Sequence, residues 1–252
     1  MSNGSTRTTG FDLPRHIGDP SAHEMVMRAL WQDYPHGGDG QRAIDVPCGA
    51  GPMSIRLRRY GFSVTCCDID LGNFQAEDFE HIQTDLNKQL PVASEQFDLV
   101  VSIAGLQRLY APQIAIREFY RILKPGGRLY LSLPNFATLR KRIRFFLYGT
   151  LGPRFDKPKY VQTLGNSEAN VRFPLMYPRV EQMVMSTGFE FENLHVRAQD
   201  AMIWTHLPLT LTAWVMARLR AMTNIDRGAA YLRSTTFGML GSSTYLIVAR
   251  KT

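Results

Sequence analysis

The sequence predicts an α/β protein built on a doubly wound sheet. Short apolar runs end in acidic residues, and a glycine-rich turn follows the first of these runs, before a stretch with helical spacing. The first run and its turn occupy residues 42–51, and the helix begins at Pro52. A strand, a tight turn and a helix N-terminus in this order can hold an anionic or nucleoside-bearing ligand, because backbone N–H groups and the helix dipole point toward it.

The remaining strands are also short apolar runs. They are expected over residues 61–67, 81–84, 96–103, 128–133, 189–197 and 243–250. The run over 96–103 is rich enough in β-branched residues to be buried on both faces, as in a parallel sheet. Helical spacing marks residues 21–34, 139–148 and 180–187.

Three carboxylates follow successive strands, namely Asp45, Asp68 and Asp85. The carboxyl ends of parallel strands share one edge of a sheet, so these acids are expected to line one nucleoside pocket. Asp68 would face the two ribose hydroxyls, and Asp85 would accept from the adenine amino group while Leu86 covers a ring face. Asp45 either braces the glycine turn or accepts from a ligand ammonium. For each acid taken alone, the alternative is a solvated cap or turn residue.

Residues 43–135 resemble the class I S-adenosylmethionine-dependent methyltransferases, in the branch that contains small-molecule, lipid and glycan enzymes. The resemblance rests on the blocks 45–51, 67–70, 84–86, 97–102 and 118–129. It implies a Rossmann-like sheet of seven mostly parallel strands, the last one antiparallel, with helices on both faces. It also implies S-adenosylmethionine as cofactor, held by Asp45, Pro47, Cys48, Gly49, Gly51, Asp68, Ile69, Asp85, Leu86 and Ser102.

The sequence departs from this family at two places. Pro47 stands where the first glycine of the turn is usual, and a proline fixes φ and removes a donor. Gln107 and Arg108 replace the Glu-His pair that many relatives carry after strand four. No acid–base role can therefore be transferred to this pair, and the weak candidates for a general base are Tyr110, His16, His195 and His206.

The chain is expected to divide into an N-terminal helix and lid over residues 1–40 and a methyltransferase domain over 41–252. Two long, poorly periodic connections, 136–178 after strand five and 201–241 after strand six, are expected to bind the acceptor. The three cysteines, Cys48, Cys66 and Cys67, lack metal-ligand spacing. They are expected to be buried, reduced thiols, and no metal site is predicted.

Residues 203–220 are strongly apolar but are interrupted by Pro208, so they are too short to span a bilayer. They are expected to pack in the core or at an interface, to touch a membrane surface, or to form a substrate lid. The net charge of +7 favours anionic partners. The basic, aromatic run 140–148 could be a solvated helix face or an RNA contact. Nucleic acid is not the expected partner, because no nucleic-acid module accompanies the run.

The function expected from these observations is transfer of a methyl group from S-adenosylmethionine to an oxygen or nitrogen of a small-molecule acceptor, including lipid- or glycan-linked ones. The alternatives are a non-catalytic binding module of the same fold and an RNA methyltransferase. A nicotinamide-dependent dehydrogenase fits less well, because the turn lacks the third glycine. A polar N-terminus predicts a cytoplasmic protein, with peripheral membrane contact as an addition. The sequence leaves the oligomeric state open.

Overall fold

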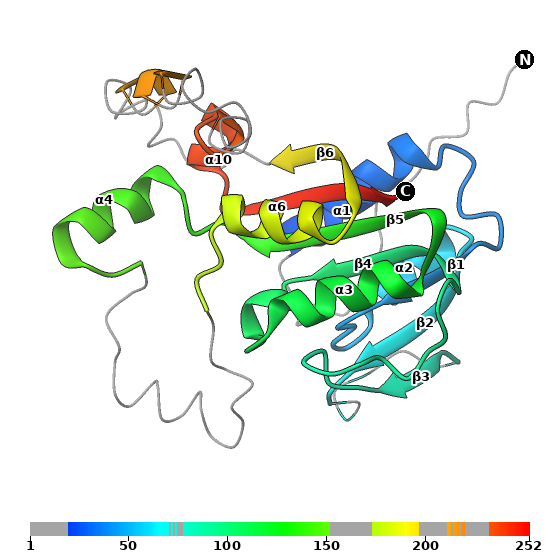
Figure 1. Ribbon diagram of the computed structural model, residues 1–252. Coiled ribbons are helices and arrows are strands. Elements are labelled where there is room, and N and C mark those ends of the chain that lie inside the picture. Colours follow the sequence, from blue (N-terminus) through cyan, green and yellow to red (C-terminus); the bar gives the residue numbers. More distant parts are fainter. Residues whose placement is uncertain are drawn as a thin grey trace, which may run out of the picture.

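The computed structural model describes residues 20–70, 72, 74, 78–151, 173–196, 211–212, 214–216, 218–219 and 232–252. A single sheet with helices on both sides forms the body of this part (Figure 1). The strands are β1 (Arg42–Asp45), β2 (Ser63–Asp68), β3 (Glu80–Gln83), β4 (Phe97–Ile103), β5 (Leu123–Pro134), β6 (Phe189–Val196) and β7 (Thr244–Lys251). The helices are α1 (Pro20–Asp33), α2 (Pro52–Arg59), η2 (Leu106–Arg108), α3 (Pro112–Ile122), α4 (Leu139–Tyr148), α6 (Tyr177–Ser186) and α10 (Phe237–Gly241).

The seven strands pair in the order β3-β2-β1-β4-β5-β7-β6. The pairs among β1 to β5 are parallel, and β7 runs antiparallel to both β5 and β6. The carboxyl ends of β1, β2 and β3 therefore lie side by side at one edge. The predicted seven-stranded, mostly parallel sheet with an antiparallel last strand is confirmed.

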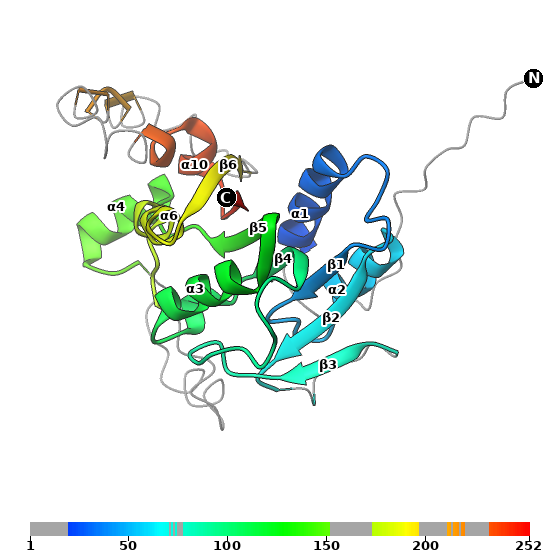
Figure 2. The same ribbon diagram turned by 45° about the vertical axis from the view of Figure 1, so that its right-hand side comes forward.

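Two hydrophobic clusters hold the helices on the two faces of the sheet. One cluster joins α1 and α2 to β1, β4, β5 and β7, and the other joins α3 and α6 to the opposite face of the same strands. Figure 2 shows α1 and α2 on one side and α3 and α6 on the other. The neighbours Cys66 and Cys67 belong to clusters on opposite faces, as strand alternation requires. All three cysteines are buried and unpaired, as expected.

Strand β5 begins earlier than the sequence predicts. Phe97 of β4 pairs with Leu123, but Leu99 then pairs with Arg128, so the residues between are extra on the β5 side. Gly126 has a φ of 79°, which a side chain would strain. Residues 124–127, with the sequence Lys-Pro-Gly-Gly, thus form a bulge inside β5, whereas the sequence predicts a strand that begins only at residue 128.

Helix α1 packs into the core of the protein. Val26 and Leu30 are fully buried among residues of the sheet and of α2, and α1 contacts β5, β6 and β7. Residues 1–19 lie outside the described part, so the lid over the cofactor stays a prediction. No helix among the described residues is long and apolar enough to cross a membrane.

The two long connections meet at Asn135, which follows β5 and is fully buried. Its Nδ2 donates to the carbonyl oxygens of Met239 and Ser242 at 2.6 and 2.9 Å, and its backbone N–H donates to Ser243 at 2.8 Å. Its Oδ1 accepts the N–H of Ala137 at 2.8 Å. We call this set of bonds the Asn135 clasp, because it joins the start of α4 to the chain entering β7.

Substituting Asn135→Ala should destabilise the protein, because three buried backbone groups lose their side-chain partner. The expected loss is about 3 kcal/mol or more of unfolding free energy, at roughly 1–3 kcal/mol for each of the three buried groups left unsatisfied. Thermal unfolding should then shift down by roughly 5–15 °C for a chain of this size. The matched control is Asn193→Ala, since Asn193 is exposed and its Oδ1 accepts only the adjacent N–H of Leu194. Equal shifts in both variants would contradict the clasp.

Candidate functional site

The turn after β1 leaves an open space beside its glycines. Gly49 and Gly51 both have positive φ, of 56° and 89°, and Gly51 precedes the first residue of α2. A Cβ built on Gly49 meets no atom within 4 Å. Pro52, at the first position of α2, has no backbone N–H, but an N–H at this position would have no partner within the helix. The turn therefore presents backbone to empty space at a helix N-terminus.

Asp45, at the end of β1, is almost fully buried. Its carboxylate accepts a hydrogen bond from the Ser54 Oγ at 2.6 Å. Burial raises the pKa of Asp45 to about 7, and the nearby charge of Asp68 adds to this, while the Ser54 bond works in the opposite direction. Near neutral pH the carboxyl is thus divided between its two protonation states.

Asp68, at the end of β2, connects three pieces of chain. Its Oδ2 accepts the N–H of Gly49 at 2.8 Å, and its Oδ1 accepts the N–H of Asp70 at 3.1 Å. Its carbonyl oxygen accepts the N–H of Thr84 at the end of β3. The side chain is half-buried. Each carboxylate oxygen keeps a free lone pair, so Asp68 can still accept bonds from two vicinal hydroxyls.

Asp85 belongs to a turn that ties two loops together. Its Oδ1 accepts both the N–H and the side-chain amide of Asn87, at 2.9 and 3.0 Å. The Asn87 Oδ1 in turn accepts the N–H groups of Tyr110 and Ala111, at 2.9 and 3.2 Å. The loop after β3 thereby holds the loop after η2. Leu86 is buried in the core cluster, with 6% of its surface exposed.

The end of β4 contributes a buried hydroxyl. Ser102 is fully buried, and its Oγ has no hydrogen-bond partner in the protein. Two residues beyond β4, Gly105 lies against the ring of Pro47, so closely that a Cβ there would be 2.4 Å from the Pro47 Cδ. An orphaned hydroxyl and an open glycine turn fit a bound nucleoside cofactor, as far as the described residues define this edge.

The other predicted cofactor residues differ in exposure. Cys48 is buried, and its N–H donates to the carbonyl of Cys67 at 2.9 Å. Ile69 is 57% exposed, directly after Asp68. The turn and the ends of the first three strands thus bring together every predicted residue except Ser102, which comes from β4, the neighbour of β1.

The two candidate general bases that the structure describes, Tyr110 and His195, lie far apart. Tyr110 is 63% exposed, and its ring contacts that of Phe173 edge to face at 5.7 Å. His195 lies on β6, four strand positions from β1, or about 19 Å at the usual spacing. Burial lowers its pKa, partly offset by the charge of Asp33. His16 and His206 lie outside the described residues.

The predicted acceptor connections are described in part. Phe173 donates its N–H to the carbonyl of Gln107 at 2.7 Å, so the end of the first connection returns to the loop after β4. In the second connection, Met239 of α10 is buried in the core cluster. Described residues between 211 and 219 are helical. Acceptor binding by these connections stays a prediction.

Sequence reasoning missed three residues that shape this edge, Ser54, Asn87 and Gly105. Ser54 occupies the third position of α2, where a hydroxyl can reach the strand end before the turn. Asn87 follows Asp85 by two residues, a spacing typical of side-chain turns. Gly105 gave no signal, because its role depends on the proximity of Pro47.

Among the described residues, no group of three His, Cys, Asp or Glu side chains could hold a metal.

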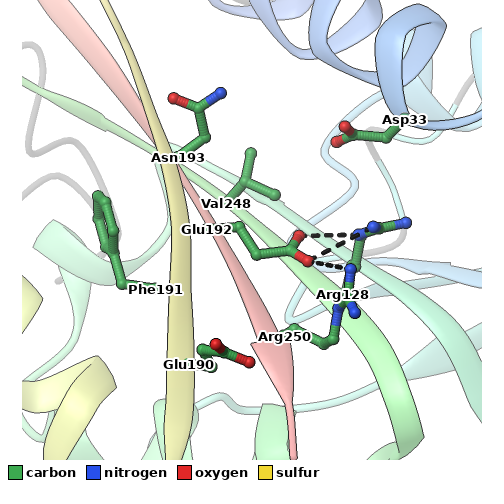
Figure 3. A pocket seen from close by; sticks show the side chains of 8 residues that line it. All are labelled: Asp33, Arg128, Glu190, Phe191, Glu192, Asn193, Val248 and Arg250. Atoms are coloured by element: carbon green, nitrogen blue, oxygen red, sulfur yellow. Dashed lines mark hydrogen bonds and ion pairs between the residues drawn. The ribbon is translucent and has the colours of Figure 1, made fainter.

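A separate polar cavity of about 410 Å³ lies at the opposite edge of the sheet (Figure 3). Its lining residues are Asp33, Arg128, Glu190, Phe191, Glu192, Asn193, Val248 and Arg250. Glu192 forms ion pairs with both Arg128 and Arg250. Open α/β sheets bind ligands at the carboxyl ends of their strands, whereas this cavity is near the amino end of β5. We therefore place the functional site at the Asp45 edge.

The strand order, with antiparallel β7 and an acid after each of the first three strands, defines the class I S-adenosylmethionine-dependent methyltransferase fold. The family model of the methyltransferase domain matches residues 44–131 of the chain. The match begins in β1 and ends in β5, so it covers the candidate site. S-adenosylmethionine is the cofactor of this class.

Comparison with known proteins supports the same class. The ubiquinone biosynthesis O-methyltransferase of Pseudomonas fluorescens is 25% identical over 138 residues, which are 51% of this chain and 57% of the relative. The matching region thus spans little more than half the length of this curated relative. Two solved structures share the fold. An S-adenosylmethionine dependent methyltransferase from Mesorhizobium loti has a TM-score of 0.55 at 16% identity, covering 90% of this chain and 98% of its own. The (4+2)-cyclase SpnF has a TM-score of 0.54 at 18% identity, covering 90% of this chain and 80% of its own.

The buried Asp45 should make stability depend on pH. A carboxyl whose pKa is raised from 3.8 to about 7 on folding binds its proton more tightly in the native state. Unfolding free energy should therefore fall as the pH rises through this window. The Asp45→Asn variant stays neutral, so above the window its unfolding free energy should exceed that of the wild type by up to about 4 kcal/mol, at about 1.36 kcal/mol per pKa unit. Thermal unfolding of both proteins across the window measures this. If the midpoints of the wild type and of Asp45→Asn changed with pH in the same way, the pKa of Asp45 would not be raised by folding.

Proposed function

We propose that this protein transfers the methyl group of S-adenosylmethionine to an oxygen or nitrogen atom of a small-molecule acceptor by direct SN2 displacement. Lipid- and glycan-linked acceptors are included in this class. The observation that carries the proposal is the line of Asp85, Asp68 and Asp45 at the ends of the neighbouring strands β3, β2 and β1. The opening beside Gly49 lies next to this line.

The proposed contacts follow from the chemistry of each group. Asp68 would accept bonds from the ribose hydroxyls with its remaining lone pairs, while its Gly49 bond keeps the turn in place. Asp85 would accept from the adenine amino group, with Leu86 against the ring. Asp45 would either pair with the ammonium of the amino-acid part or only brace the turn through Ser54. Ser102 would donate its unused hydroxyl to the same part.

When bound, the cofactor supplies a methyl group that is already electrophilic on its sulfonium. The protein then needs to align the acceptor and exclude water, and these effects can account for a large part of the rate. Tyr110 and Phe173 border the same edge, after η2 and before α6, and we assign them to the acceptor side. Tyr110, His16, His195 and His206 remain the candidate bases.

An oxygen acceptor is supported by the curated relatives, which are named as ubiquinone biosynthesis O-methyltransferases. Because the matching region spans just over half of such a relative, the acceptor is proposed as a chemical class. The cyclase among the solved structures has the same fold, so a direct assay of methyl transfer is needed. That assay also separates the enzyme from a non-catalytic binding module.

Replacing Asp68 by Asn should weaken binding of S-adenosylhomocysteine about tenfold or more. A hydrogen bond to a charged group contributes roughly 1.5–3 kcal/mol, and the amide would keep the Gly49 contact while losing the charge. Isothermal titration of both proteins measures the change. The control is Glu190→Gln, a similar loss of charge at an exposed residue of the opposite edge. If the affinity of Asp68→Asn were unchanged, the ribose hydroxyls would have to bind to a residue other than Asp68.

Thermal unfolding with saturating S-adenosylhomocysteine tests the cofactor itself, with NADH as the control. A ligand at about 100 times its Kd adds about 2.7 kcal/mol, which should raise the midpoint by roughly 5–10 °C. A shift with NADH alone would overturn the proposal. Transfer of labelled methyl to hydroxylated or amino acceptors then tests catalysis. Binding without transfer to any such acceptor would favour the non-catalytic module.

The pH dependence of cofactor affinity separates the two roles of Asp45. If Asp45 pairs with the ligand ammonium, binding favours its ionised form, so the affinity should rise as the pH increases toward about 7. If Asp45 only braces the turn, the affinity of the wild type should follow that of Asp45→Asn at each pH. Titrations of the two proteins over the same pH range decide between these outcomes.

A further inference from the structure

Helix α4 is anchored to the protein only by its first half. Leu139 is buried, and the Lys141 ammonium donates to the carbonyl of Asn135 at 2.5 Å. The Arg142 guanidinium donates to the carbonyl of Ser234 at 2.9 Å. Through these two bonds the cations hold the start of the helix, and burial lowers the pKa of both groups. The rest of α4 extends from the body (Figures 1 and 2).

The last turn of α4 exposes four consecutive large apolar or aromatic residues. The exposed fractions are 56% for Phe145, 87% for Phe146, 59% for Leu147 and 71% for Tyr148. Successive residues of a helix point about 100° apart, so these four cover every side of the turn. More than half of each of these four residues is exposed. A cluster of this kind on a water-soluble surface marks a site of interaction.

The charged residues in the stretch of sequence that contains this turn all have one sign. Residues 136–151 contain four cations, Arg140, Lys141, Arg142 and Arg144, and no acid. Arg140 is exposed and Arg144 half-exposed, and neither is needed to hold the helix. Aromatic residues next to arginines are typical of helices that lie in the interface of an anionic bilayer. Each such cation near the surface of an anionic membrane adds to binding.

A second apolar segment lies at the same end of the molecule. Leu211, Val215, Met216 and Leu219 are exposed by 41–67%. The guanidinium of Arg218 stacks on the ring of Trp214, at 4.2 Å from its centre. Residues 203–220 also contain no acid. Figures 1 and 2 show these helical pieces and α4 at the same end, beyond the carboxyl edge of the sheet.

We propose that the last turn of α4, together with the exposed residues between 211 and 219, docks the protein on a bilayer that contains anionic phospholipid. A second copy of the chain is a poorer occupant, since a symmetric contact would bring cations against cations. A nucleic acid would use the arginines but would leave Phe146 and Leu147 largely in water. The bilayer satisfies both the charge and the apolar surface. This docking does not depend on methyl transfer.

The test is sedimentation of the full chain with vesicles of phosphatidylcholine alone or of phosphatidylcholine mixed with phosphatidylglycerol. The wild type should bind the anionic vesicles, and high salt should weaken this binding. The double variant Phe145→Ser/Phe146→Ser should bind them at least about tenfold more weakly. The double variant Arg140→Gln/Arg144→Gln should lose about fivefold for each arginine.

The matched control is Ile114→Ser/Met185→Ser, which removes exposed apolar side chains from α3 and α6 instead. It should bind vesicles like the wild type. All variants should keep the thermal shift with S-adenosylhomocysteine, so that misfolding and failure of the cofactor site are recognised separately.

Several outcomes would overturn the proposal. These are no sedimentation of the wild type, equal binding to neutral and anionic vesicles, or an equal loss in the α3/α6 control. Binding of a single-stranded oligonucleotide, lost in the α4 variants without any vesicle binding, would assign the surface to nucleic acid. A dimer in sedimentation velocity that dissociates on Phe145→Ser/Phe146→Ser would assign it to a second copy.

Discussion

The backbone N–H of Gly49 donates to the Asp68 carboxylate at 2.8 Å, and the candidate site depends on this bond. It connects the turn after β1 to the end of β2, so that the open side of the turn and the free lone pairs of Asp68 face one space. The neighbouring bond from the Cys48 N–H to the Cys67 carbonyl fixes the same turn to the same strand. A nucleoside ligand would therefore meet donors and acceptors that are already in position, which reduces the cost of ordering them.

Asp45 shows how such a site departs from the most stable arrangement. A buried carboxylate is costly when ionised, and one hydroxyl from Ser54 compensates for only part of this cost. If folding stability were the only requirement, a neutral side chain at this position would be more favourable than Asp45. Proteins accept this kind of cost where a ligand later supplies the missing charge, so the instability of Asp45 is itself an argument that a ligand binds beside it.

The local features of this chain could be predicted from the sequence, and the contacts between distant segments could not. Apolar runs with an acid at the end, such as Asp45 and Asp68, predicted the strands and the edge where they gather. Between the Phe97–Leu123 pair and the Leu99–Arg128 pair, β5 contains a bulge that no periodicity reveals. The bonds from Asn87 to the backbone of Tyr110, and from Asn135 to Met239 across 104 residues, depend on how loops meet after folding. His195 was among the candidate bases because the sequence does not show the strand order, in which β6 lies four positions from β1.

The Asn135 clasp has a consequence for how the family can vary. Both long connections leave the sheet at its carboxyl edge, and a single buried side chain fixes the root of one to the root of the other. The clasp fixes the ends of the two connections next to β5 and β7. Residues added or lost within the connections therefore do not disturb the register of β5 with β7. Selection can therefore reshape the two connections while the strands that carry Asp45 and Asp68 stay unchanged. With the methyl transfer proposed above, such a protein could acquire a new acceptor without having to evolve its cofactor pocket again.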